Sequence, residues 1–234
     1  MMYVPAGLGM VLSGGAWLHV ALLALWTAGY FAFFALGLWL KSRRKSRYFG
    51  PVRTYGLITI GLGALVLAWA PGLVVWAPAF IPLLATSLVC SHLRKDRSVL
   101  NDGVLVAAAA LMGPVMFDAG AGENWAALWA ATALSGAYFF GTVLYVKTII
   151  RERGSRGYLV ASIGYHMFLV ALPLIFGAIL NLPGTLALMG AFSFCAVRAV
   201  VGPRLTVTPK QVGILEIFVT AAVTCAIVLS LSPL

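Results

Sequence analysis

The stretch YFFGTVLYVKTIIRERGSRGYLVASIGYH, residues 138–166, decides the fold class. In this stretch an apolar run ends in a cluster of charged residues, and apolar sequence resumes directly afterwards. The same alternation runs through all 234 residues, which are 62% hydrophobic and only 9% charged. Soluble globular proteins contain about 25% charged residues. The sequence therefore predicts an all-α integral membrane protein, a polytopic helix bundle forming one domain over residues 1–234.

Hydropathy predicts about nine membrane spans, of which the first is incomplete. A membrane-crossing helix needs about 20 mostly apolar residues. The first apolar run, residues 1–12, corresponds to only about 18 Å of helix, so it is too short to cross. Prolines inside later spans predict kinked helices. The other predicted spans are 17–40, 55–70, 75–91, 103–117, 125–153, 158–180, 185–201 and 212–229, and the prolines within them are Pro78, Pro82, Pro114 and Pro173.

The distribution of basic residues predicts the topology. The net charge is +10, yet the 16 lysines and arginines do not form a nucleic-acid-binding surface, because they occur only in connections between spans or at span ends. Connections with and without basic residues alternate, as the positive-inside rule requires. We therefore expect the basic connections on the cytoplasmic side of the membrane, with the N-terminus inside and the C-terminus outside. The basic windows are 41–53, 94–97, 147–156 and 198–210.

Several kinds of site have no pattern in this sequence. Cys90, Cys195 and Cys225 lie inside apolar runs without metal-ligand or disulfide spacing. Phosphate-loop, serine-hydrolase and zinc-protease motifs are missing. The sequence thus predicts neither a metal nor a cofactor, and the expected partner is the lipid bilayer.

The cluster of charged residues within 147–156 is the main candidate site. Lys147 and Arg151 are four residues apart, as are Thr148 and Glu152, so both pairs are expected along neighbouring stripes of one helix end. Together with Arg153 they offer arginine, which binds anions bidentately, and lysine, which supplies a mobile charge. The alternative interpretation is that these side chains only anchor the helix end by snorkelling.

Ionisable residues inside predicted spans add further candidates. His166 lies about 12 Å along the helix from Tyr158, a depth at which it must face the protein interior or a wet cavity. Arg198 and Glu216 are also intramembrane, where exposing a charge to lipid is unfavourable. They alternatively form a structural pair, with Arg204 or Lys210 as other partners for the glutamate.

Asn101 and Asp102 are either ligand-binding candidates or caps for the helix that begins near Ser98. The candidates for proton handling are His166 and Glu152. The ligand-binding candidates are Lys147, Thr148, Arg151, Arg153, Asn101, Asp102, Arg198 and Glu216.

Four sequence blocks resemble the YwiC-like family of bacterial membrane proteins. They are RSVLND at 97–102, GTVLYVKTIIRERG at 141–154, SIGYH at 162–166 and TPKQVGILEI at 208–217. The resemblance covers nearly the whole chain in order, and the lysine and arginine block is its most specific part. It implies a multi-pass protein of the bacterial cytoplasmic (inner) membrane, without implying a reaction.

Members of that family open with a Pro-Asn-Gln-His-Gly-Ala-Trp stretch before the first span, whereas this chain opens with MMYVPAGLGM. Together with the short first helix, this suggests a start codon placed too far downstream. The expectation is an in-frame His-Gly-Ala-Trp in the upstream genomic DNA.

The architecture also resembles the UbiA prenyltransferase superfamily more weakly, through nine spans and polar loops after the second and sixth helices. The aspartates that bind magnesium diphosphate in that superfamily have no match here, so its chemistry is not implied.

Three functions are compatible with the sequence. The first is a cytoplasm-facing cavity that binds an anionic small molecule or lipid headgroup at the joint of the sixth and seventh helices, with or without catalysis. The second is a transporter whose proline-broken helices surround a path. The third is a non-catalytic partner in a membrane complex.

Overall fold

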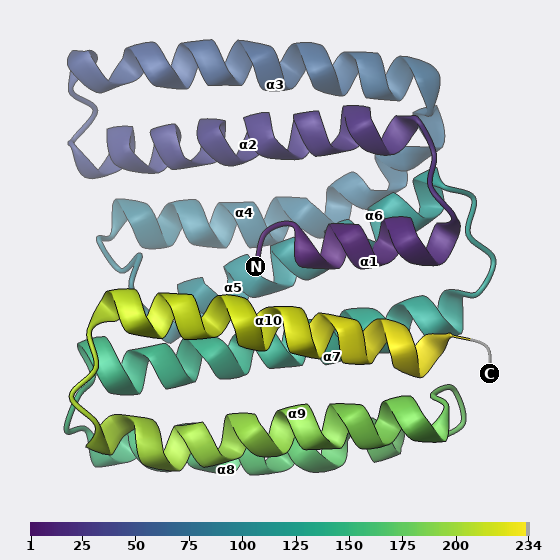
Figure 1. Cartoon of the computed structure of the whole chain (residues 1–234). Helices are drawn as coiled ribbons and strands as arrows, with labels where there is room; N and C mark the ends of the chain where they lie inside the picture. The colour runs from purple at the N-terminus through teal and green to yellow at the C-terminus, as the bar shows by residue number, and fades with distance from the viewer. Residues whose placement is uncertain (233–234) are drawn as a thin grey trace. The chain divides into compact units, whose positions relative to one another are not determined.

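The predicted apolar spans form helices in the computed structural model, which describes residues 1–232. Among these residues, eight helical segments are long and apolar enough to cross a membrane, and the short first helix is not one of them. This confirms an all-helical, multi-pass architecture. The α-helices are α1 (Val4–Ser13), α2 (Leu18–Lys41), α3 (Phe49–Trp69), α4 (Ala77–His92), α5 (Val99–Ala110), α6 (Met112–Ala119), α7 (Trp125–Val146), α8 (Arg156–Ile175), α9 (Leu182–Val201) and α10 (Pro209–Leu231) (Figure 1).

Contacts divide the chain into two compact units. Unit 1 contains Met1–Leu8 and the chain from Asn124 onward, and unit 2 contains Gly9–Glu123. That the chain forms a single domain stays a prediction.

Unit 1 is a ring of four helices. Helix α7 packs against α8, α8 against α9, α9 against α10, and α10 back against α7. The α9–α10 approach is close because Gly184 lies against the backbone of Ser230, where a Cβ atom would clash. Asn181 fixes the same end, since its side chain caps α9 and donates a hydrogen bond to the Leu229 carbonyl oxygen at 2.7 Å. The ring therefore encloses an interior to which all four helices contribute side chains.

Unit 2 is built around α2, which packs against α3, α4 and α6, while α4 also packs against α5. A buried histidine joins α2 to α6. The Nδ1 atom of His19 accepts from the Ala16 N–H at 2.9 Å, and its Nε2–H donates to the Met116 carbonyl at 2.8 Å. Both ring nitrogens are thus used in holding the fold together.

Helix boundaries differ from several of the predicted spans. The predicted span 55–70 begins earlier, at Phe49, because the helix also includes Arg53 and Thr54 and the four residues before them. The predicted span 103–117 is two helices that meet at Leu111. Pro114 lacks the N–H that would bond the Ala110 carbonyl, which explains the break. The predicted span 158–180 is regular only as far as Ile175.

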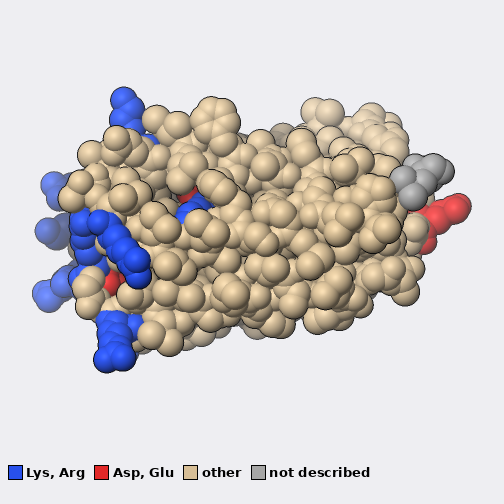
Figure 2. Space-filling view, turned by 60° about the horizontal axis from the view of Figure 1, so that its bottom comes forward, with Lys and Arg blue, Asp and Glu red and all other residues tan. Residues whose placement is uncertain are grey.

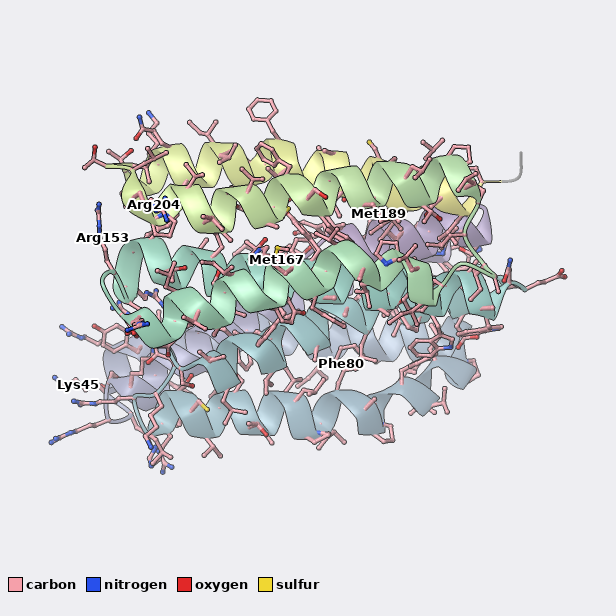
Figure 3. All side chains as sticks on the ribbon, turned by 90° about the horizontal axis from the view of Figure 1, so that it is seen from below. Lys45, Phe80, Arg153, Met167, Met189 and Arg204 are labelled. Atoms are coloured by element: carbon pink, nitrogen blue, oxygen red, sulfur yellow. The ribbon has the colours of Figure 1, made fainter. Side chains whose placement is uncertain are left out.

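Each unit carries its lysines and arginines at one end of its helices, which we call its basic end (Figure 2). In unit 1 the basic end comprises the α7–α8 and α9–α10 connections, from which Arg153 and Arg204 project (Figure 3). In unit 2 it comprises the α2–α3 and α4–α5 connections, and Lys45 extends outward from the first of these (Figure 3). This is the charge pattern on which the topology prediction rests.

Candidate functional site

A cluster of polar side chains lies inside the ring of unit 1, near its basic end. All four helices of the ring contribute to it, although an apolar ring would not need any of these groups. We call it the buried polar cluster. It consists of Tyr138, Thr142 and Tyr145 from α7, His166 from α8, Arg198 from α9, and Glu216 and Thr220 from α10.

Arg198 is the centre of the cluster. Its side chain is 95% buried, with 5% exposed. The Nη1 atom donates a hydrogen bond to Oε1 of Glu216, and the guanidinium lies over the ring of Tyr145, 4.3 Å from its centroid. The Nε and Nη2 atoms are buried without a hydrogen-bond partner among the described residues. Because Nε–H and Nη2–H point the same way, the guanidinium presents one complete, unused hydrogen-bonding edge.

Two further hydrogen bonds join α7 to α10 and fix the glutamate. Thr142 donates its hydroxyl to Oε2 of Glu216 at 3.2 Å. One helical turn away, the hydroxyls of Tyr138 and Thr220 share a hydrogen bond of 3.0 Å. Both carboxylate oxygens of Glu216 therefore accept hydrogen bonds, which fixes this side chain beside Nη1, while the Nε/Nη2 edge of Arg198 has no partner among the described residues.

His166 occupies the α8 side of the cluster and is only 1% exposed. Its Nδ1–H donates to the Ser162 carbonyl at 2.7 Å, so a neutral ring keeps Nε2 as an acceptor. The ring meets that of Tyr145 edge-on, with 6.5 Å between centroids. Gly141 permits this approach, because a Cβ there would stand 3.3 Å from Nε2. The hydroxyl of Ser162 is also buried without a partner among the described residues.

A π-helical turn, Lys147–Arg151, ends α7 at the α7–α8 joint. The Thr148 hydroxyl lies 2.9 Å from the Leu144 carbonyl oxygen and 2.8 Å from that of Tyr145, and so competes for the bonds of a regular turn. Such turns occur frequently at functional sites.

The π-turn separates the residues of the predicted charged stripe. Lys147 is 4% exposed and Thr148 is also buried, whereas Arg151 is exposed and Glu152 is half-buried. Arg153 is exposed and donates to the Leu205 carbonyl at 3.3 Å, which ties the two connections of the basic end together. The structure therefore does not gather the five residues on one surface.

Asn101 and Asp102 belong to unit 2. The residue that caps α5 is Ser98, whose side chain accepts from the Asn101 N–H, so the interpretation of Asn101 and Asp102 as the caps is wrong. The Asn101 amide instead accepts from Ser87 at 2.6 Å and donates to the Asp96 carbonyl at 2.8 Å. These bonds join α4 to the start of α5 and account for the burial of Asn101. Asp102 is half-buried in the first turn of α5.

The sequence interpretation named Arg198, Glu216 and His166 but missed the residues of α7 that surround them. Tyr138, Thr142 and Tyr145 are spaced i, i+4 and i+7, which places three polar groups on one face of an otherwise apolar helix. That spacing was the available signal. The predicted Arg198–Glu216 pair is present.

Sequence comparisons match the chain to one family model and to relatives in two bacteria. A family model described as YwiC-like protein matches residues 1–117. A Bacillus subtilis (strain 168) protein named "Uncharacterized protein YwiC" is 30% identical over 180 residues, which are 76% of this chain and 74% of that protein. An "Uncharacterized protein" of Haemophilus influenzae is 28% identical over 228 residues, covering 94% of this chain and 90% of that protein. No solved structure matches the chain, so the resemblance to the UbiA superfamily stays a prediction.

Proposed function

The chain belongs to the YwiC-like family, and we propose that this member binds an anionic small molecule or lipid headgroup in the buried polar cluster, at the joint of α7 and α8. The observation that carries the proposal is the unpaired Nε/Nη2 edge of Arg198 inside a protein interior. In native proteins the large majority of buried polar atoms have hydrogen-bond partners. A buried cation with two unused donors is therefore a strong candidate for a ligand site.

The chemistry of this edge favours a phosphate or a carboxylate. Two parallel N–H donors match two oxygens of such a group and form bidentate, charge-assisted hydrogen bonds. Glu216 holds Nη1 and the ring of Tyr145 lies under the guanidinium, so the edge is presented in a fixed orientation. Preorganisation of this kind lowers the free energy lost on binding. Arg198 thus takes the central role that the sequence interpretation gave to the lysine and arginines of the α7–α8 connection.

Entry is proposed from the cytoplasmic side, on which the positive-inside rule puts the basic end of unit 1. The exposed arginines there attract anions toward the site. Arg151 and Arg153 are then recruiting residues, and Lys147 is a buried cation at the same joint. His166 keeps a free acceptor nitrogen in its neutral form, so it is the candidate for taking a proton from a bound ligand.

The test is native mass spectrometry on the full chain, extracted from its own membranes in mild detergent, followed by titration with inorganic phosphate. We expect a co-purifying anionic species that is lost in Arg198→Gln. Loss of the bidentate contact weakens binding by about 10- to 100-fold, because hydrogen bonds to charged groups contribute about 1.5–3 kcal/mol. Arg204→Gln is the matched control, since it removes an exposed arginine from the same basic end.

A second variant distinguishes loss of binding from loss of folding. Arg198→Lys keeps the positive charge beside Glu216 but lacks the planar fork, so we expect it to fold and to bind weakly. Binding that survives both substitutions, or that falls equally in Arg204→Gln, would refute the proposal.

The two other hypotheses predict different results. A transporter would catalyse uptake of the same anion into proteoliposomes, with Arg198→Gln abolishing it. A non-catalytic complex partner would instead retain a stoichiometric protein through detergent extraction, and Arg198→Gln would leave that complex intact.

A further inference from the structure

The basic end of unit 2 contains a cleft that neither the fold nor the buried polar cluster explains. Two adjoining depressions, of about 380 Å³ and about 630 Å³, share Lys41 and Arg94 in their walls. Volumes of this size are typical of small-molecule sites. We call the two together the basic cleft. Its lining consists of Leu40, Lys41, Arg43, Arg44, His92, Arg94, Lys95, Asp96, Arg97 and Ser98.

Three arginines of the basic cleft have a left-handed backbone. The φ angles are 59° at Arg43, 60° at Arg44 and 58° at Arg94, and among the described residues only Ala121 shares this property without being glycine. The conformation is unfavourable for a residue with a Cβ atom, and glycine normally takes this position after a helix. Strained backbone of this kind gathers at functional sites.

With this backbone conformation the chain hydrogen-bonds back to the ends of α2 and α4. The Arg44 N–H donates to the Trp39 carbonyl at 3.0 Å, and its guanidinium lies 5.8 Å from the Trp39 ring. At the end of α4, the Arg94 N–H donates to the Ser91 carbonyl at 3.1 Å. Lys45, in the α2–α3 connection, differs from these arginines. It extends outward, as a side chain that only anchors the helix end would (Figure 3).

An ion pair joins the two walls. Lys41 Nζ lies 2.8 Å from Oδ2 of Asp96, which links the end of α2 to the α4–α5 connection. Asp96 is the one carboxylate in the lining, against six lysines and arginines. The lining therefore has an excess of positive charge, and an anion bound among these cations reduces the repulsion between them.

We propose that the basic cleft is a second anion site, built for a ligand that carries two or more phosphate charges. Its lining carries six cations against one carboxylate, so the phosphate groups are what it recognises. The same chemistry is found in a doubly phosphorylated lipid headgroup and in a soluble polyphosphate. The site lies wholly in unit 2, so it does not depend on the function proposed for Arg198.

The experiment uses the purified full chain with two probes. Soluble pyrophosphate is titrated calorimetrically, and nanodiscs containing cardiolipin are compared with nanodiscs of phosphatidylcholine alone by native mass spectrometry. The variants are Arg44→Gly and Arg94→Gly. Glycine suits the left-handed backbone. We therefore expect both variants to fold, to unfold at a higher temperature than the parent without ligand, and to bind at least tenfold more weakly.

Arg53→Gln is the matched control, because it removes an exposed arginine from the same end of unit 2 without touching the cleft. It should bind like the parent. Binding of pyrophosphate alone assigns a soluble ligand, and selective retention of cardiolipin assigns a lipid headgroup. The proposal is overturned if neither probe binds, or if Arg53→Gln weakens binding as much as the two glycine variants do.

Discussion

Replacing Glu216 with leucine tests the buried polar cluster most directly. The substitution removes the one hydrogen-bond acceptor that the structure gives to the Arg198 guanidinium, leaving the cation over the Tyr145 ring. Breaking a buried ion pair from one side destabilises a protein by about 3–5 kcal/mol, because the remaining charge is uncompensated. In a chain of this size about 1 kcal/mol lowers the melting temperature by about 2–4 °C. We therefore expect a fall of about 6–20 °C.

The double variant Arg198→Met/Glu216→Leu completes the test. Replacing both partners by apolar side chains removes the uncompensated charge, so most of the lost stability should return. Glu152→Leu is the control, since Glu152 is a half-buried carboxylate on the α7–α8 connection and is expected to change stability by less than about 0.5 kcal/mol. Thermal unfolding in mild detergent, followed by intrinsic tryptophan fluorescence, supplies the measurement. A double variant that is as unstable as the single one would refute the reasoning.

Two further predictions concern the packing of each unit. A hydrogen bond from Lys41 lowers the pKa of Asp96, so the pair contributes stability above the ordinary carboxyl pKa of about 3.9 and loses it as the pH falls through the lowered value. Asp96→Asn should therefore destabilise unit 2 by less than about 1 kcal/mol at pH 7, and urea titrations at successively lower pH should show the difference vanish. Gly184→Ala should lower stability by about 1–3 kcal/mol, because a Cβ would strike Ser230, whereas Gly190→Ala has open space and should be neutral in the same melting assay.

Hydropathy alone predicted most of the fold. Every span that crosses lipid must consist of mostly apolar residues whose backbone hydrogen bonds are satisfied within the helix. A run of apolar residues can be recognised directly in the sequence. The shifted boundaries follow from residues that hydropathy treats as loop. Phe49 begins α3 well before the apolar run, because a helix can continue through polar residues beyond the hydrocarbon. The break at Leu111 was signalled by Pro114, although its position was not.

The candidate site was predicted only in part. Arg198, Glu216 and His166 were found because ionisable residues are conspicuous in apolar runs, and Thr142 was within reach of a spacing argument. The unpaired Nε/Nη2 edge of Arg198 could not be predicted from the sequence, since it depends on how four helices pack. The left-handed arginines of the basic cleft were equally hidden, because the usual signal at such positions is glycine and none is present there.

The ring of unit 1 also sets an order of biogenesis. Helix α7 is synthesised first of the four, and its polar face of Tyr138, Thr142 and Tyr145 finds its partners on α9 and α10. Until the ribosome has produced α10, Thr142 and Arg198 lack the Glu216 carboxylate to which both donate, and Tyr138 lacks the Thr220 hydroxyl. Release of these helices one at a time into the bilayer would leave Arg198 without its counter-ion, so the cluster favours their retention at the insertion machinery until α10 arrives.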